Sequence, residues 1–266
     1  MSLTEDQIET IVDRYTSGES AYRIANSLGV TPNAVYYRLK QEGIGRRPQG
    51  FPRFPINGSR FDSLLEESLY WSGFIAADGH IDTRPNRTPS ISIGLSGIDK
   101  PHLEKFLEFV EAPRNKISVF NKMTSTGLRE YCSVSVTSKE IVDRLEYLGV
   151  KGPSLSKDLR DSRDFWRGVF DGDGYISKEM KYPLATLGGK LYLVEPYKEF
   201  IAKHLNINIK VDSYDPTAHK IQSSGNSTYK IVDYLYTDSS IYLDRKKKRA
   251  DDIIEYYISR DRGNHV

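Results

Sequence analysis

Two aspartate–glycine pairs end two copies of one nine-residue pattern. Residues 71–79 read Trp-Ser-Gly-Phe-Ile-Ala-Ala-Asp-Gly, and residues 166–174 read Trp-Arg-Gly-Val-Phe-Asp-Gly-Asp-Gly. Each copy has the apolar pattern of a short helix that carries an aspartate at its C-terminal end. A carboxylate is electrostatically disfavoured there, and a second one beside it is worse. If the copies pack side by side, Asp78 and Asp173 form a pair that needs divalent cations.

Small residues at helical spacing indicate how the two copies meet. Gly73 and Ala77 stand four residues apart in the first copy, and Gly168 and Gly172 do so in the second. Small side chains at this spacing let two helices approach backbone to backbone. The glycine that follows each aspartate suits the left-handed conformation that closes many helices.

Two simpler interpretations of the aspartates compete with this one. Asp-Gly is an ordinary turn dipeptide, so two pairs could arise by chance. Asp171 to Gly174 also resembles the start of a calcium-binding loop, but Tyr182 stands at the twelfth position, where that loop needs glutamate. Chance does not explain why the surroundings repeat as well, with Ile-Val-Asp at residues 141–143 and again at 231–233.

The duplicated pattern resembles the single-chain, two-motif LAGLIDADG homing endonucleases over roughly residues 63 to 260. Trp71 and Trp166 replace the leading leucine of the consensus, and Ala76 replaces its first aspartate in copy one. The resemblance implies an α+β fold of two pseudo-symmetric αββαββα halves, whose saddle-like sheets bind DNA. The alternation of helical and period-two segments along the chain predicts the same element order.

The resemblance also implies metal-dependent cleavage of double-stranded DNA across the minor groove. Asp78 and Asp173 would be the catalytic acids, one per half, and the backbone carbonyls of Ala77 and Gly172 would complete the metal shell. Two or three Mg²⁺ ions are expected at the seam between the halves, where Mn²⁺ or Ca²⁺ can substitute.

The family places a lysine near each scissile phosphate, in a loop that follows the last core helix of each half. Leu243 to Lys246 fits the pattern Leu-x-Arg-Lys, which makes Lys246 the counterpart in the second half. A solvated basic helix start is the alternative there. In the first half Pro153 stands at the expected position, so Lys151 is the choice and Lys157 the reserve. Unequal cleavage of the two strands would follow if neither lysine reaches the site.

Before the duplicated region, the chain has the pattern of a small helical module. Ile24 to Thr31 resembles the turn of a helix-turn-helix, and Pro32 suits the first position of a third helix. In that family the third helix enters the major groove of DNA. A plain helical hairpin used for packing or dimerisation is the alternative.

The composition shifts predict six segments along the chain. They are a helix-turn-helix module at 1–45, an extended basic linker at 46–62, the first half at 63–150, an inter-half linker at 151–162, the second half at 163–260 and a tail at 261–266.

Candidate DNA contacts are polar and basic residues on the third helix, the linker and the strands. A sheet with such a face can lie in the major groove and read base edges, although for any one residue a solvated side chain is the simpler explanation. On the module and linker they are Thr31, Asn33, Tyr36, Tyr37, Arg38, Lys40, Arg46, Arg47 and Arg53. In the first half they are Arg84, Arg87, Lys116, Asn121, Lys122, Arg129, Ser133 and Ser135. In the second half they are Lys178, Lys181, Tyr182, Lys210, Tyr214, Lys220, Gln222, Ser224, Lys247 and Lys248.

The bulk composition excludes several other classes. No apolar run approaches membrane-spanning length, and the first residues are not a signal peptide. One cysteine, Cys132, excludes an intrachain disulfide and a cysteine-based zinc site, so an intracellular, cytoplasmic location is expected. The net charge of +2 is too small to prove a nucleic-acid partner.

Together these patterns predict a monomeric, site-specific homing endonuclease with a long, asymmetric double-stranded DNA target and no membrane partner. Two alternatives remain. One is a transcriptional regulator that binds DNA on the same scaffold without cutting it, and the other is an RNA maturase.

Overall fold

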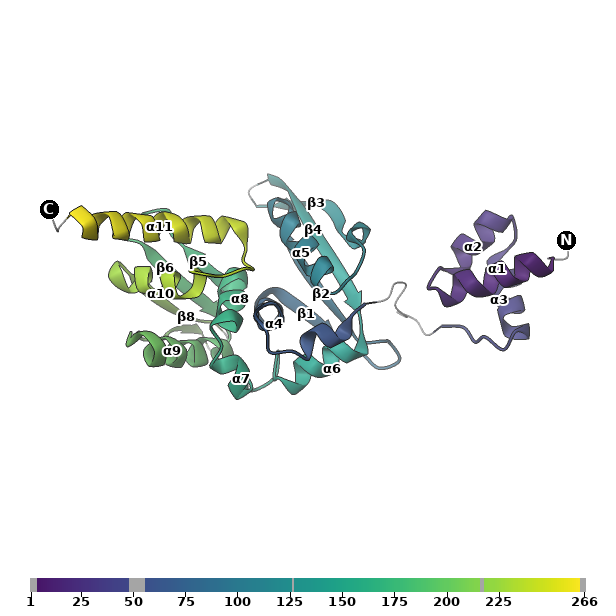
Figure 1. Ribbon diagram of the computed structural model, residues 1–266, viewed down its shortest axis with the longest axis horizontal. Helices are drawn as coiled ribbons and strands as arrows, with labels where there is room; N and C mark the ends of the chain where they lie inside the picture. The colour runs from purple at the N-terminus through teal and green to yellow at the C-terminus, as the bar shows by residue number, and fades with distance from the viewer. Residues whose placement is uncertain (1–3, 48–55, 126, 216–217, 264–266) are drawn as a thin grey trace.

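The computed structural model describes residues 4–47, 56–125, 127–215 and 218–263. The buried apolar residues form two separate clusters. The smaller one lies within residues 11–39, and the larger one extends from Phe61 to Ile253. Figure 1 shows the two parts of the chain that surround these clusters. The predicted linker residue Arg53 lies outside the described residues.

The N-terminal part is a three-helix module whose helices are α1 (Glu5–Thr16), α2 (Ala21–Leu28) and α3 (Pro32–Gln41). The side chains of Thr4, Ser20 and Thr31 cap the three N-terminal ends by accepting backbone N–H groups. Gly29 ends α2 in the left-handed region, with a φ of 66°. The local sequence therefore fixes where each of the three helices begins.

The rest of the described chain forms two halves with the same order of elements. The first half contains α4 (Glu66–Asp78), β1 (Gly79–Asp82), β2 (Ser90–Ser96), α5 (Lys100–Phe109), β3 (Ser118–Thr124), β4 (Gly127–Thr137) and α6 (Lys139–Tyr147). The second half contains α8 (Arg163–Asp173), β5 (Gly174–Ile176), β6 (Leu184–Gly189), α9 (Leu191–Leu205), β7 (Asp212–Asp215), β8 (Ala218–Ser224) and α10 (Asn226–Tyr236). The short helix α7 (Lys157–Arg160) joins the halves, and α11 (Asp244–Gly263) follows them.

Each half has one four-stranded antiparallel sheet. The strand orders are β1-β2-β4-β3 and β5-β6-β8-β7, so the two sheets have the same topology. The predicted α+β class and the αββαββα order of each half are therefore confirmed.

The alternation along the strands separates a buried face from a polar face. On β4, Cys132, Val134 and Val136 are buried against the helices, as their spacing predicts. Ser135 lies on the opposite face, where its hydroxyl is 3.2 Å from that of Ser92 on β2. The first half therefore buries one side of its sheet and leaves short hydroxyl side chains on the other, and β8 of the second half shows the same alternation of buried and outward residues.

The two motif helices, α4 and α8, pack against each other at the boundary between the halves. A Cβ atom on Gly73 would lie 2.0 Å from the carbonyl oxygen of Phe165, and one on Gly168 would lie 2.0 Å from that of Tyr70. Only glycine allows backbones to come this close, so the predicted backbone-to-backbone contact is present. This contact holds the C-terminal ends of both helices together.

The glycine after each aspartate has a different role from the predicted one. Gly79 has a φ of −77° and Gly174 a φ of −82°, so neither is left-handed. The chain passes directly from each helix into a strand, which needs extended backbone. Glycine is still required, because a Cβ atom would lie 2.7 Å from the Ile75 carbonyl oxygen and 2.3 Å from that of Phe170.

Replacing the glycine at this contact is expected to destabilise the protein. Gly168→Ala places a methyl group against the backbone of α4, and overpacking of this kind costs about 1–3 kcal/mol or more. Urea unfolding measures the change. Gly94→Ala is the matched control, because its nearest neighbour would lie 4.0 Å away. A Gly168→Ala protein as stable as Gly94→Ala would contradict the backbone contact.

Candidate active site

Asp78 and Asp173 are the last residues of α4 and α8, and both are exposed at the end of an otherwise buried helix pair. A Cβ atom on Gly172 would lie 3.5 Å from the carboxyl carbon of Asp78, so this side chain lies against the end of the opposite helix. A Cβ atom on Gly189 would lie 3.6 Å from Oδ2 of Asp173. The two carboxylates therefore share one seam, which is open to solvent.

The surroundings of the seam disfavour negative charge on both carboxylates. Partial burial of the carboxyl group against the helix ends and, to a smaller extent, the charge of Asp173 together raise the pKa of Asp78 to about 6. Burial also raises the pKa of Asp173. Helix C-terminal ends add partial negative charge at the same place. The seam is therefore a site where cations are favoured.

Two lysines from different loops reach the ends of these helices. The Nζ atom of Lys151 donates to the carbonyl oxygen of Ala77 at 3.0 Å. Lys246 is 2% exposed, and its Nζ atom donates to the carbonyl oxygens of Phe170 at 2.7 Å, Asp171 at 2.6 Å and Gly172 at 3.3 Å. Burial lowers the pKa of Lys246 to about 8.

These contacts clarify the choice between the two lysines of the first half. Lys151 contacts the end of α4, and its charge acts on both Asp78 and Asp173. Lys157 begins α7 instead, where its charge acts on Asp161. The structure thus brings Lys151 to the seam together with Lys246.

The carbonyl groups of Ala77 and Gly172, which were expected to bind metal, are hydrogen-bonded to the lysines. A carbonyl oxygen has two lone pairs, so one bond to lysine leaves an acceptor position free. The seam then offers two carboxylates and two carbonyl oxygens, all of them hard ligands suited to Mg²⁺ or Ca²⁺. Within the described parts of the chain, His, Cys, Asp and Glu form no cluster of three or more that could hold a metal. The donor set therefore fits a hard divalent ion held by one carboxylate from each half.

Two charged groups that the sequence did not single out hold the loop before α11 against the first half. Arg167 is fully buried on α8, and it donates to the carbonyl oxygen of Ile241 at 2.8 Å and to Glu66 on α4 at 2.6 Å. Glu66 in turn accepts the backbone N–H of Ser240 at 2.8 Å. Arg167 stands inside the repeated motif, and an arginine in a buried helix pattern is the signal that could have found it.

Solved structures similar to this chain share its two-half architecture. The homing endonuclease I-WcaI, solved bound to its DNA recognition sequence, matches with a TM-score of 0.53 and 16% sequence identity, over 70% of this chain and 86% of I-WcaI. The LAGLIDADG homing endonuclease I-GzeII, in complex with its DNA target, has a TM-score of 0.48 and 12% identity, over 77% of this chain and 94% of I-GzeII. The chain has the two-domain LAGLIDADG fold. No protein-family model and no curated protein matches the sequence.

In the first LAGLIDADG half, the strand register places half of the candidate DNA contacts on the polar face. Lys122 pairs with Arg129, and Ser118 pairs with Ser133, on the same face of the sheet as Ser135. Asn121 pairs with Glu130, so it lies on the opposite face and is left out of the proposed interface. The remaining basic candidates of this half lie outside the strands: Arg84, Arg87 and Lys116. Of these, Arg84 is already paired with the carboxylate of Asp82.

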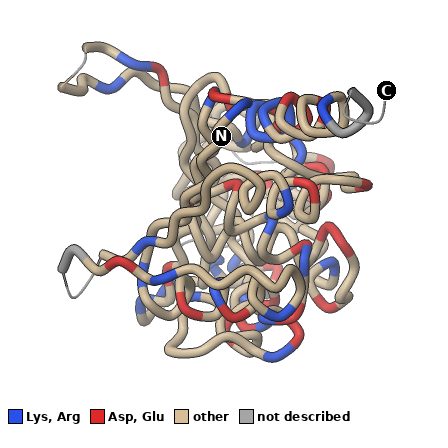
Figure 2. Tube along the Cα trace, turned by 90° about the vertical axis from the view of Figure 1, so that its left-hand side faces the viewer, with Lys and Arg blue, Asp and Glu red and all other residues tan. Residues whose placement is uncertain are grey.

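In the second LAGLIDADG half, Lys220, Gln222 and Ser224 alternate with buried residues on β8 and share the polar face. The other candidates whose side chains are described lie beside the sheet, in the β5–β6 connection, before β7 and on α11: Lys178, Lys181, Tyr182, Lys210, Lys247 and Lys248. The side chain of Tyr214 lies outside the described part of the structure. Figure 2 shows that Lys and Arg gather in the part of α11 furthest from the C-terminus.

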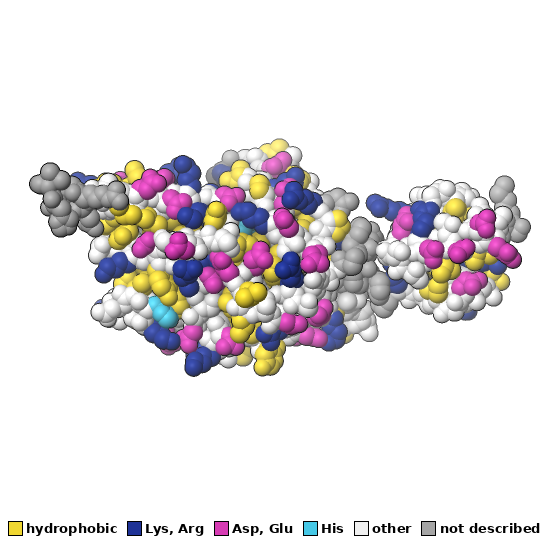
Figure 3. Space-filling view, viewed as in Figure 1, with side chains coloured by type: hydrophobic (Ala, Val, Ile, Leu, Met, Phe, Trp, Pro, Cys, Tyr) yellow, Lys and Arg dark blue, Asp and Glu magenta, His cyan; other side chains and the backbone are white. Residues whose placement is uncertain are grey.

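The face of the molecule seen in Figure 3 carries positive and negative side chains intermingled. A surface that follows a DNA backbone has one dominant sign of charge. This face therefore lacks the charge pattern of a surface that follows a DNA backbone.

On the N-terminal module, the candidate contacts divide into exposed and packed residues. Asn33, Tyr37 and Lys40 are exposed at helical spacing on one side of α3. Thr31 caps α3, Arg38 is half-buried, and Tyr36 packs edge-on against Tyr15.

The two arginines after α3 lie on the module itself. The guanidinium carbon of Arg46 lies 4.2 Å from the ring centre of Tyr36, and that of Arg47 lies 3.8 Å from the ring centre of Tyr15. The backbone N–H of Arg47 also donates to the Tyr15 hydroxyl at 3.0 Å. Cation–π contacts and this hydrogen bond therefore fold the start of the linker back onto the helices.

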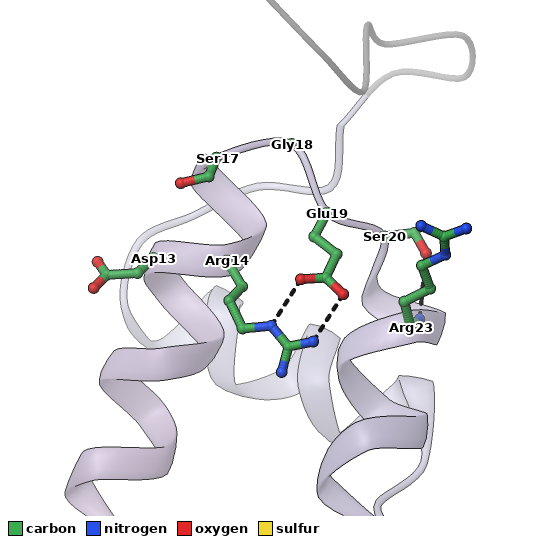
Figure 4. A pocket seen from close by; sticks show the side chains of 7 residues that line it. All are labelled: Asp13, Arg14, Ser17, Gly18, Glu19, Ser20 and Arg23. Carbon is green, nitrogen blue, oxygen red and sulfur yellow. Dashed lines mark hydrogen bonds and ion pairs between the residues drawn. The ribbon is translucent and has the colours of Figure 1, made fainter. Parts of the chain in front are cut away.

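A hollow of about 390 Å³ lies at the turn between α1 and α2 (Figure 4). Arg14 and Glu19 form a two-point ion pair inside it, with distances of 2.7 and 2.8 Å. The charged side chains that line the hollow are Asp13, Arg14, Glu19 and Arg23, two of each sign, so the hollow gives no reason to assign an anion site.

Among the helices of the described residues, none combines the length and the apolar character that crossing a membrane requires.

The raised pKa of Asp78 predicts that ionisation of this group lowers folding stability. From about pH 4 to about pH 6 the folded chain holds a proton that the unfolded chain has released, so stability falls as the pH rises through this range. The full shift corresponds to about 3 kcal/mol, and solvent screening reduces it to about 1–2 kcal/mol.

Asp78→Asn should therefore raise the free energy of unfolding by about 1 kcal/mol at neutral pH without divalent ions, and flatten its pH dependence. Urea unfolding in a chelator across this pH range measures both effects. Asp252→Asn, which removes an exposed carboxylate on α11, is the control. A less stable Asp78→Asn protein would contradict the unfavourable charge at the seam.

Proposed function

We propose that this chain is a site-specific, metal-dependent DNA endonuclease that cuts both strands of a duplex. The observation that carries the proposal is the seam, where each half contributes one exposed carboxylate and one lysine reaches each helix end. A purely structural helix pair gains nothing from two carboxylates whose pKa values are both raised at this position. Groups with perturbed pKa values gather at functional sites.

The residues of the seam divide the work of phosphodiester hydrolysis. Asp78 and Asp173 would hold the divalent ions, of which Mg²⁺ is the first choice, and the Ala77 and Gly172 carbonyl oxygens would complete the ligand set. When bound, such ions would activate a water and neutralise charge on the leaving oxygen. Lys151 and Lys246 place positive charge next to the phosphate of one strand each, and one carboxylate per half fits one strand per half.

The polar faces of the two sheets would bind the DNA. In the first half Lys122, Arg129 and Ser133 can read base edges, and in the second half Lys220 and Gln222 can do so. The two sets differ, so the target is asymmetric, and two sheets in one chain make it long. I-WcaI is solved with its own recognition sequence bound. A monomer that acts on DNA inside the cell follows from this proposal.

The N-terminal module extends the contact with DNA. Asn33, Tyr37 and Lys40 form an exposed polar face on α3. In a helix-turn-helix, the corresponding helix lies in the major groove. The module would therefore contact DNA outside the part covered by the two sheets.

A regulator that binds DNA without cutting it and an RNA maturase are the alternatives on this scaffold. Neither needs both carboxylates at an open seam. The presence of Asp78 and Asp173 together with two lysines therefore favours the nuclease.

Cleavage tests the proposal directly. The full chain is incubated with Mg²⁺ and a randomised duplex library, and cleaved duplexes are selected and amplified to give a target. Asp78→Asn and Asp173→Asn should each lower cleavage of that target by at least about 100-fold while binding in Ca²⁺ persists, because the carboxylates hold the ions that activate water. Lys157→Ala, on α7, is the control. Tight binding without any Mg²⁺-dependent cleavage would support the regulator instead.

The α3 face has its own test. The triple variant Asn33→Ala, Tyr37→Ala, Lys40→Ala should bind the selected target more weakly. Loss of the Lys40 charge removes about one phosphate contact, so the slope of log affinity against log salt should become shallower by about 0.9. Gel-shift titrations at several salt concentrations measure both effects. Glu5→Ala, exposed on α1, is the matched control. Unchanged affinity in the triple variant would remove α3 from the interface.

A further inference from the structure

Asp171 is a buried carboxylate in the second motif that plays no part in the mechanism above. It is 1% exposed and accepts three hydrogen bonds, from the Tyr70 hydroxyl at 2.7 Å, the Tyr236 hydroxyl at 2.6 Å and the backbone N–H of Leu243 at 2.7 Å. A buried carboxylate is tolerated only when its oxygens are satisfied in this way. Asp171 therefore joins α4, α8, α10 and the loop before α11 at one point.

The backbone bond to Leu243 links Asp171 to Lys246. The carbonyl oxygen of Leu243 accepts the backbone N–H of Lys246 at 2.9 Å, at the first turn of α11. The side chain of Lys246 then turns back to the carbonyl oxygens at the end of α8, including that of Asp171 itself. The place where Lys246 enters the seam is therefore set by the peptide that Asp171 holds.

The first half supports Asp171 from across the seam. Tyr70 on α4 donates its hydroxyl hydrogen to Asp171, and its oxygen lies 2.9 Å from Nε2 of His102 on α5. Nε2 must then carry the hydrogen that is donated to Tyr70. Burial lowers the pKa of His102 to about 3, so the ring is neutral. A chain of buried hydrogen bonds thus runs from α5 of the first half to the loop of the second.

The first half has no equivalent of this carboxylate. Ala76 stands at the corresponding position of its motif. The loop that carries Lys151 is closed locally instead, with Gly149 at a φ of 82° and the N–H of Gly152 bonded to the carbonyl oxygen of Gly149 at 3.0 Å. A tight turn positions one lysine and a buried carboxylate positions the other.

We propose that Asp171 is a positioning residue for Lys246, supported by Tyr70 and His102, and that it governs the cleavage of one DNA strand only. This inference rests on the proposed nuclease function. Asp171 does not touch the DNA in this scheme. It holds the Leu243 peptide, and through that peptide it fixes the lysine of the second half.

Two measurements on Asp171→Asn test the proposal. Hydrogen exchange of the DNA-free protein should be faster in peptides that cover residues 240–246, because the amide side chain presents donors where only acceptors fit. On the selected duplex, with a different label on each strand, one strand should be cut about 10–100-fold more slowly, the usual effect of losing a supporting residue. The cleavage rate of the other strand should stay within about threefold of wild type, because the loop that carries Lys151 is closed without Asp171.

Ser223→Ala is the matched control, because it removes another buried hydrogen bond of the second half, to Thr228 at 2.8 Å, away from the loop. It should change neither strand selectively. If Asp171→Asn does not fold, Tyr236→Phe removes one donor to the same carboxylate and should slow the same strand to a smaller extent.

Equal slowing of both strands, or unchanged exchange at residues 240–246, would overturn the positioning role while leaving the nuclease intact. If the wild-type chain yields no cleaved duplex from the library, the proposed function itself fails, and the positioning role fails with it.

Discussion

The contact between α4 and α8 is the constraint on which the rest of the structure depends. Gly73 and Gly168 let the two backbones touch, with room for no side chain between them. Helices that meet this closely also bring their C-terminal ends together, and each end carries an aspartate. Helix dipoles and carboxylates then place several partial and full negative charges at one seam. The packing of α4 against α8, and not the sequence preference of either helix, therefore creates the excess of negative charge that attracts cations.

The chain offsets this charge with its own lysines. Lys151 and Lys246 donate to the carbonyl oxygens of the helix ends, so the seam is partly neutral without any ion. Burial disfavours the charged form of Lys246 and lowers its pKa to about 8. Catalytic sites typically have an unfavourable arrangement of charges that packing elsewhere in the protein holds together, so they lower the stability of the fold.

Features with a strong period could be predicted from the sequence, and features that depend on tertiary contact could not. The phase of β4 was predictable because Cys132, Val134 and Val136 alternate with polar residues. β3 is exposed along almost its whole length, so no alternation fixes its phase, and only the pairing with β4 shows which face Asn121 lies on. The burial of Asp171 and the cation–π packing of Arg47 arise from residues far apart in the chain, which no local pattern reports.

The two copies of the motif have diverged at positions that control the loops around the seam. Ser72 and Ala76 in the first copy correspond to Arg167 and Asp171 in the second. Arg167 and Asp171 can be buried only because the first half supplies Glu66 and Tyr70 as their partners. The loop before α11 is therefore held in place with the help of the first half. A symmetric dimer would need the same residues on both sides. In a single chain the two halves can differ, and unlike halves suit the asymmetric DNA target proposed above.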